Sequence, residues 1–96
     1  MDITKFYKEY DVSKNITEPI MSKYEYTQIL GLRVQQIERG SEPLIDVTSD
    51  LDTPQLIAEE ELRQRKTPFI LKRKIGLDKY EFWKIEDLSI GIDLLD

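Results

Sequence analysis

Residues 21–37 read MSKYEYTQILGLRVQQI, and they carry the strongest helical signal in the chain. Ser22 and Glu25 have the S-x-x-E spacing of a capping box, in which each side chain accepts a hydrogen bond from the other residue's backbone amide. Apolar residues then recur along one helical face, at Tyr26, Ile29, Leu30, Val34 and Ile37. Gly40 is typical of the position just after a helix. The pattern predicts a helix at about residues 23–39.

Gly31 lies inside this predicted helix, and the apolar periodicity does not explain it. The chain has 4 glycines, and a glycine in a helix interior costs about 1 kcal/mol relative to alanine. Glycine permits close backbone contact, and the planar guanidinium of Arg33 suits carboxylates and carbonyls. We therefore expect Gly31, Arg33 and Gln36 to form a face that packs against another chain.

The residues after Gly40 predict a second helix and a β-hairpin. Pro54 suits a first helical position, with Asp52 and Thr53 as candidate caps, and the second helix is expected over PQLIAEEELRQR. Two β-rich runs, 69–75 and 79–84, flank a short turn and predict a hairpin. We expect Tyr80 and Phe82 to pack inside it, and residues 86–88 to form one helical turn.

The expected fold class is α+β and mainly helical, with two principal helices, a small β-hairpin and a short C-terminal turn. Residues 1–20 show no sustained period and are interpreted as an N-terminal tail or arm. Residues 21–88 form the expected domain, and 89–96 a C-terminal tail. A two-stranded sheet is marginal alone, and an exposed strand edge can accept a strand from another chain.

Composition limits the chemistry that is available. The 96 residues fit one domain, and the absence of cysteine and histidine removes disulfides and nearly every zinc, iron or copper site. We expect no catalytic residues, no cofactor and no metal. The net charge of −5 argues against general binding to nucleic acid or anionic membranes. No apolar run is long enough to span a membrane, so an intracellular protein is expected.

A basic cluster leaves an alternative open. It comprises Arg63, Arg65, Lys66, Lys72, Arg73 and Lys74, with no acid between them. Such a cluster is compatible with an independent single-stranded nucleic-acid-binding domain in which bases stack on aromatic rings, here Phe69, Tyr80, Phe82 and Trp83. A mixed solvated or partner-facing patch is the other interpretation. A hydrolase is disfavoured by the missing catalytic groups.

Several motifs in order resemble one known family. MSKYE, GLRVQQI, PLIDV, DTPQLIAEEELRQRKTPFILKRKI and YEFW are similar to the small subunit shared by multisubunit RNA polymerases. That subunit is called omega in bacteria, subunit K in archaea and the sixth common subunit in eukaryotes. The resemblance covers about residues 21–88.

The resemblance implies a subunit without catalysis of its own, which binds the largest polymerase subunit and helps it assemble and stay folded. It implies an omega-like fold in which the first helix and adjoining loops make this contact. The positions that match the motifs and are expected to bind the largest subunit are Lys23, Tyr24, Glu25, Gly31, Arg33, Gln36, Ile37, Pro54, Pro68 and Arg73.

The same resemblance sets the other expectations about partners and location. Through the largest subunit the chain would join the whole polymerase, with no direct specific contact to nucleic acid, no membrane and no homo-oligomer. The compartment would be the nucleus for a eukaryotic source and the cytoplasm for an archaeal one. For a large DNA virus it would be the virion or the infected-cell cytoplasm.

Overall fold

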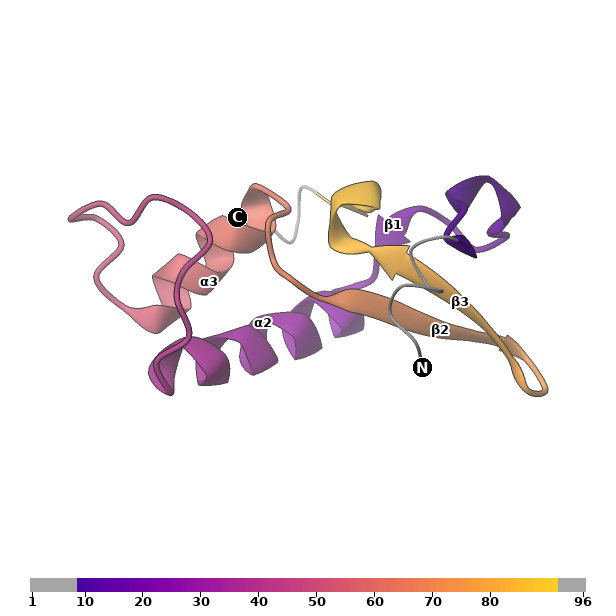
Figure 1. Cartoon of the computed structure of the whole chain (residues 1–96), viewed down its shortest axis with the longest axis horizontal. Helices are drawn as coiled ribbons and strands as arrows, with labels where there is room; N and C mark the ends of the chain where they lie inside the picture. The colour runs from indigo at the N-terminus through magenta and orange to yellow at the C-terminus, as the bar shows by residue number, and fades with distance from the viewer. Residues whose placement is uncertain (1–8, 92–96) are drawn as a thin grey trace.

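The computed structural model describes residues 9–91 and has the expected α+β arrangement. The elements in chain order are a 3₁₀ turn η1 (Val12–Lys14), β1 (Ile20–Met21), α2 (Lys23–Glu38), α3 (Pro54–Arg63), β2 (Ile70–Gly76), β3 (Lys79–Lys84), a 3₁₀ turn η2 (Ile85–Asp87) and β4 (Ser89–Ile90). Figure 1 shows the two helices at one end of the molecule, with the β2–β3 hairpin extending away from them. No helix among residues 9–91 is long and apolar enough to cross a membrane.

Helix α2 begins and ends as its sequence predicts. The Ser22 side chain accepts a hydrogen bond from the Glu25 amide at 3.1 Å, and Glu25 Oε1 accepts one from the Ser22 amide at 2.9 Å. The capping box is therefore confirmed. At the other end Gly40 has a φ of 104°, a backbone conformation that residues other than glycine rarely adopt.

Helix α3 begins at the predicted proline and ends two residues before the predicted end. Thr53 caps it, since its Oγ1 accepts a hydrogen bond from the Leu56 amide at 3.2 Å, and Pro54 occupies the first helical position. Arg65 has a φ of 57°, so the backbone leaves the helix there. The Lys66 amide then donates to the Glu61 carbonyl at 2.8 Å, which satisfies a helix-end carbonyl.

The hairpin lies close to its predicted position, with β2 and β3 antiparallel, but the prediction for Tyr80 and Phe82 was wrong. Side chains alternate between the two faces of a strand. Trp83 is buried on the inner face, so Phe82 and Tyr80 fall on the outer face, opposite Lys72 and Lys74. Tyr80 is 44% exposed and Phe82 is half-buried.

A short parallel pair joins the segment before α2 to the C-terminal end of the described chain. β1 pairs with β4, with Ile20 opposite Ser89 and Met21 opposite Ile90. The sequence did not predict this pair, because two residues per strand carry no periodicity. It brings Met21 and Ile90 into one core cluster that also contains Ile29, Leu62, Trp83, Ile85 and Leu88.

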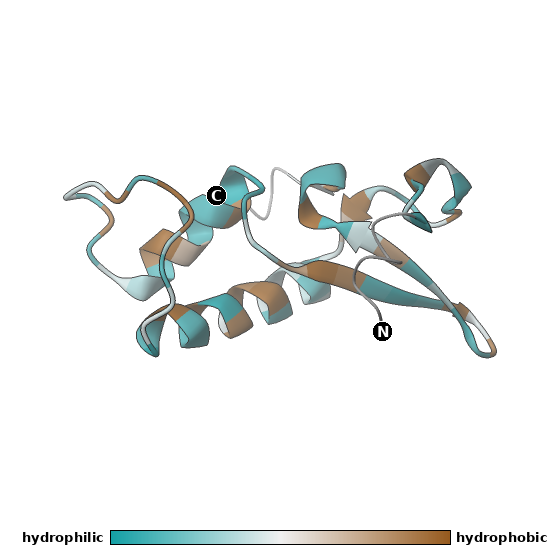
Figure 2. Ribbon diagram, in the orientation of Figure 1, coloured by the Kyte–Doolittle hydropathy of each residue, from teal (hydrophilic) through white to brown (hydrophobic). Residues whose placement is uncertain are grey.

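The apolar residues of this core come from both helices, from the hairpin and from the segments before α2 and after β3. Figure 2 shows hydrophobic segments on both helices and at the start of β2, whereas the middle of β2 is hydrophilic. Residues 41–53 contain no strand, and Leu44 and Val47 in this loop are about half exposed, at 49% and 50%. The core therefore lies between the helices and the near end of the hairpin.

Candidate partner-binding surface

One side of α2 faces solvent along its whole length. Five residues at helical spacing define this outer face of α2: Tyr24, Gln28, Gly31, Leu32 and Gln35. Tyr24 is 70% exposed and Leu32 55% exposed, which is high for large apolar side chains. Gln28 Nε2 donates to the Tyr24 hydroxyl at 2.7 Å and fixes the ring on the helix surface. The large apolar side chains of the outer face are therefore exposed to water.

Gly31 lies in the middle of the outer face, and none of residues 9–91 packs against its open side. An ideal Cβ built at Gly31 has no heavy atom within 4 Å, so internal packing does not require glycine there. The backbone is regular helix, since Gly31 has no positive φ. The cost of about 1 kcal/mol relative to alanine is therefore not recovered within the described residues.

Arg33 lies on the opposite side of α2 and is buried against α3. Its Nε donates to Glu61 Oε1 at 2.5 Å and its Nη2 to Glu61 Oε2 at 2.8 Å. This is a bidentate ion pair whose two side chains are 3% and 0% exposed. The hydrogen bond to Glu61 raises the pKa of the Arg33 guanidinium above its usual value. The charged end of Arg33 is thus satisfied inside this chain.

The same ion pair holds the loop that leaves α2. Arg33 donates to the Gln36 side chain and to the Glu42 carbonyl, both at 3.0 Å. Glu61 Oε2 also accepts from the Leu44 amide at 2.9 Å. One buried arginine and one buried glutamate therefore tie α2, α3 and the 41–53 loop together, which compensates the desolvation of both charges.

Arg73 makes the corresponding junction at the hairpin end. It pairs with Glu25, Nε to Oε2 at 2.9 Å and Nη2 to Oε1 at 3.0 Å. Its remaining donors reach the Glu18 carbonyl at 2.5 Å and the Ile20 carbonyl at 2.7 Å. Burial by itself raises the pKa of Glu25, but hydrogen bonds from Arg73 and Ser22 outweigh it and hold that pKa below its usual value. Arg73 joins β2, α2 and the segment before β1.

Residues 10–20 lie along the hairpin and are held by Glu81. Its carboxylate accepts from the Thr17 amide at 3.1 Å, from the Thr17 hydroxyl at 2.6 Å and from the Ile16 amide. Burial by itself raises the pKa of Glu81. These hydrogen bonds lower the pKa by more than burial raises it, so it lies below its usual value. Tyr10 donates to Asp87 at 2.7 Å and accepts from the Lys84 amide at 2.9 Å.

The ten positions expected to bind a partner divide by exposure. The exposed ones are Lys23, Tyr24, Gly31, Gln36 and Pro68. Ile37 and Pro54 are half-buried, the latter at the start of α3. Glu25, Arg33 and Arg73 are the members that make ion pairs inside the chain. The expected partner face is thus partly surface and partly the framework that supports it.

Sequence reasoning did not single out Glu61 as the partner of Arg33. Glu61 is the one acid within the stripe Ile57, Ala58 and Leu62, all of which are buried. The available signal was an acidic residue within the apolar stripe of one helix together with an arginine on the buried side of the preceding helix. Buried charges are usually paired, so these two residues indicate an ion pair. Among residues 9–91 no group of three acidic side chains is placed to hold a metal ion.

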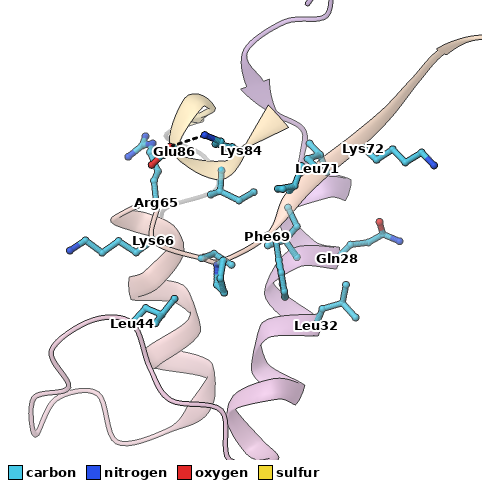
Figure 3. Close-up of a pocket in the computed structure, with 15 residues that line it drawn as sticks. Gln28, Leu32, Leu44, Arg65, Lys66, Phe69, Leu71, Lys72, Lys84 and Glu86 are labelled. Atoms are coloured by element: carbon cyan, nitrogen blue, oxygen red, sulfur yellow. Dashed lines mark ion pairs between the residues drawn. The ribbon is translucent and has the colours of Figure 1, made fainter. Parts of the chain in front are cut away.

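An open groove between α2 and the start of β2 also escaped the sequence reasoning. Its apolar residues include Leu32, Leu44, Phe69 and Ile70. Its polar lining includes Arg65, Lys66, Thr67, Lys72, Lys84 and Glu86. Figure 3 shows Leu32 from α2 and Leu44 from the loop on either side of Phe69, with Lys66 and Lys72 extending in opposite directions. We call this feature the β2 groove.

Comparison with known proteins assigns the family. The family model described as RNA polymerase Rpb6 matches residues 15–69, which run from the segment before β1 through both helices to the start of β2. The chain belongs to the RNA polymerase Rpb6 family. The match contains all of α2 and α3, so the Arg33–Glu61 junction lies inside the matched region.

Individual relatives extend the similarity beyond that region. A probable DNA-directed RNA polymerases I, II, and III subunit RPABC2 of Caenorhabditis briggsae is 36% identical over 84 residues, 88% of this chain and 60% of that protein. The RPABC2 subunit of Saccharomyces cerevisiae is 33% identical over 90 residues, 92% of this chain and 57% of the yeast protein.

A viral relative is similar to the same degree. DNA-directed RNA polymerase subunit 6 of Acanthamoeba polyphaga mimivirus is 37% identical over 84 residues, 88% of this chain and 21% of that protein. The chain therefore spans about three-fifths of the length of the nematode and yeast relatives, and much less of the viral one.

Proposed function

We propose that this protein is a non-catalytic subunit of a multisubunit DNA-directed RNA polymerase. In this role it binds and stabilises the largest subunit and promotes assembly of the enzyme for transcription. The relatives from a nematode, yeast and a giant virus are all named as subunits of DNA-directed RNA polymerases, which supports this proposal. A subunit of this kind acts inside the cell, in the nucleus or the cytoplasm according to the source, or in a virion.

The observation that carries the proposal is the outer face of α2. Gly31 is unexplained by internal packing, and Tyr24 and Leu32 beside it are large and exposed. A partner that packs closely on this face would use the space left by the missing side chain and would cover both apolar groups. Among the ten expected positions, Lys23, Tyr24, Gly31, Gln36 and Pro68 supply direct contacts in this proposal. Glu25, Arg33 and Arg73 hold the surface in shape.

The variant Gly31→Leu separates the two roles of this position. In the isolated chain leucine should stabilise α2 by up to about 1 kcal/mol, because it has the higher helix propensity and the space is open. In the complex the added side chain should overlap with the partner. Co-expression with the largest subunit and affinity purification should recover the complex for wild type and lose most of it for the variant.

Gln55→Leu is the matched control for this experiment. Gln55 is an exposed helical position on α3, away from the outer face of α2, and its side chain bonds to Glu59 alone among the described residues. The control should co-purify as wild type does. Normal recovery of the Gly31→Leu complex would contradict close packing at this face.

Thermal unfolding tests the stabilising role directly. A partner that binds only the folded chain raises its melting temperature with concentration. We expect a higher melting temperature in the presence of the largest subunit than in its absence. An unchanged melting temperature at saturating partner would exclude the proposed function.

The nucleic-acid alternative has less support from the positions of the aromatic residues. Trp83 is 4% exposed, so it offers no face for stacking. Tyr80 is accessible, but the Lys72 ammonium lies over its ring at 4.1 Å from the centroid. Stacking of a base on Tyr80 would first have to displace this cation.

A further inference from the structure

We propose that the β2 groove binds an extended, acidic and apolar segment of a protein partner, which adds as a strand to the free edge of β2. The β2 groove shares Gln28 and Leu32 with the outer face of α2 and also includes Pro68, but Gly31 does not line it. The proposal does not depend on polymerase membership. Four observations carry it: the two edges of the hairpin, the apolar lining, the charge of the rim and one buried hydroxyl.

The two edges of the hairpin differ in how they are covered. The outer edge of β3 is held by the preceding segment, since Asn15 Nδ2 donates to the Phe82 carbonyl at 3.0 Å and Tyr10 Oη accepts from the Lys84 amide at 2.9 Å. In an antiparallel pair, the backbone N–H and C=O groups of every second residue point away from the partner strand, so those of alternate β2 residues point away from β3. Within residues 9–91 none of them hydrogen-bonds outside the β2–β3 ladder. The edge of β2 is therefore open to a strand from another chain.

The lining of the groove suits a peptide better than a nucleic acid. Leu32, Leu44 and Ile70 line the groove and are 55%, 49% and 38% exposed. Phe69 is the single aromatic residue among the described side chains that line it, and it is half-buried against the core. Aliphatic side chains on alternate positions of an added strand would cover these groups.

The rim of the groove selects the charge of that strand. Arg65, Lys66, Lys72 and Lys84 line the groove, whereas Glu86 is its one acidic residue within the described chain. This local excess of positive charge contrasts with the net charge of −5 for the whole protein. A segment with acidic side chains would be attracted to this rim, and a basic segment would be repelled.

A buried hydroxyl marks the floor of the groove. Thr67 is 5% exposed and lines the groove, and its Oγ1 has no hydrogen-bond partner among residues 9–91. A buried polar atom without a partner is costly to the free chain. A small shift of the Thr67 side chain toward the groove on binding would let a group of the bound segment supply the missing hydrogen bond.

The test uses the full chain and a synthetic peptide that alternates glutamate with valine. A peptide with lysine in place of each glutamate and a single-stranded oligothymidylate serve as competitors. We expect saturable binding of the acidic peptide, with backbone amide NMR shifts concentrated in residues 66–72 and slower amide exchange along β2. Absence of binding at low salt, equal binding of the lysine peptide, or binding of the oligonucleotide alone would overturn the proposal.

Variants assign the contacts within the groove. Lys66→Glu combined with Lys72→Glu should weaken the acidic peptide at least about tenfold, because it reverses two rim charges. Lys74→Glu is the matched control, since Lys74 is exposed on the same strand but does not line the groove. Equal weakening by the control would mean that net charge, not the groove, attracts the peptide, and would overturn the assignment.

Thr67→Val distinguishes the groove from a merely basic surface. Valine has nearly the same shape as threonine and removes the unpartnered hydroxyl. The melting temperature of the free chain should rise, while affinity for the peptide should fall roughly threefold to tenfold as one hydrogen bond is lost. An unchanged affinity would overturn the role assigned to Thr67. Circular dichroism of each variant verifies that the fold is retained.

Discussion

Arginine–glutamate pairs hold two regions of this molecule, and they differ in how completely water is excluded. At the helical end Arg33 and Glu61 are almost fully buried and join α2, α3 and a loop. At the hairpin end Arg73 and Glu25 keep 13% and 17% of their side-chain surface and join β2, α2 and the segment before β1. A third pair, Arg63 and Glu60, lies within α3 and is far more exposed.

The residue types of an ion pair do not by themselves determine how much the pair contributes to stability. Removing one partner of a buried pair leaves an uncompensated charge in a low-dielectric interior. Removing one partner of an exposed pair leaves a charge that water solvates. The three pairs should therefore rank by burial and by the number of elements that they join.

The largest effect is expected for Glu61→Ala. The change strands the Arg33 guanidinium and frees the Leu44 amide, so the free energy of unfolding should fall by about 3–5 kcal/mol. Urea unfolding followed by circular dichroism measures it. The double variant Arg33→Met, Glu61→Leu removes both charges and should recover most of the loss. A single variant within about 1 kcal/mol of wild type would contradict the central role of this pair.

Arg73→Ala should have the next largest effect. It removes the pair with Glu25 and the bonds to the Glu18 and Ile20 carbonyls, and we expect a loss of about 2–3 kcal/mol because the lost hydrogen bonds involve a charged group. Residues 10–20 should also become easier to cleave by trypsin after Lys14. Lys74→Ala, exposed on the same strand, is the control. Equal cleavage in both variants would argue against Arg73 as the anchor of this segment.

Acid should weaken the hairpin region through Glu25. The folded-state pKa of Glu25 lies below its ordinary value of 4.5, so the folded protein releases this proton more readily than the unfolded chain. This contribution to stability is present above about pH 4.5 and is lost as the pH falls through the folded-state pKa. In Glu25→Gln the fall in unfolding free energy below that pH should be shallower. A pH profile identical to wild type would show that Glu25 does not contribute.

The smallest effect is expected for Arg63→Ala. Hydrogen bonds from Arg63 and Gln64 lower the pKa of Glu60 to about 2. The Arg63 side chain is nonetheless 59% exposed, and water replaces what the variant removes. The melting temperature should stay within experimental error of wild type. A loss comparable to that of Arg73→Ala would break the ranking by burial.

Local elements of this fold could be predicted because their signals are short-range. The capping box of Ser22 and Glu25, the proline that begins α3 and the glycine that ends α2 each depend on neighbours within one or two turns. The hairpin followed from two β-rich runs around a turn. Several motifs in order resemble the small subunit of multisubunit RNA polymerases, and this resemblance agrees with the Rpb6 match over residues 15–69.

Only the tertiary structure decided which polar residues face inward. The sequence displays Gly31, Arg33 and Gln36 within six positions, yet α2 turns Gly31 to open solvent and Arg33 to Glu61, 28 positions further on. The parallel β1–β4 pair and the unpartnered Thr67 likewise depend on segments distant in the chain. Short-range patterns define where helices and strands begin and end, whereas burial and charge pairing arise only when those elements pack.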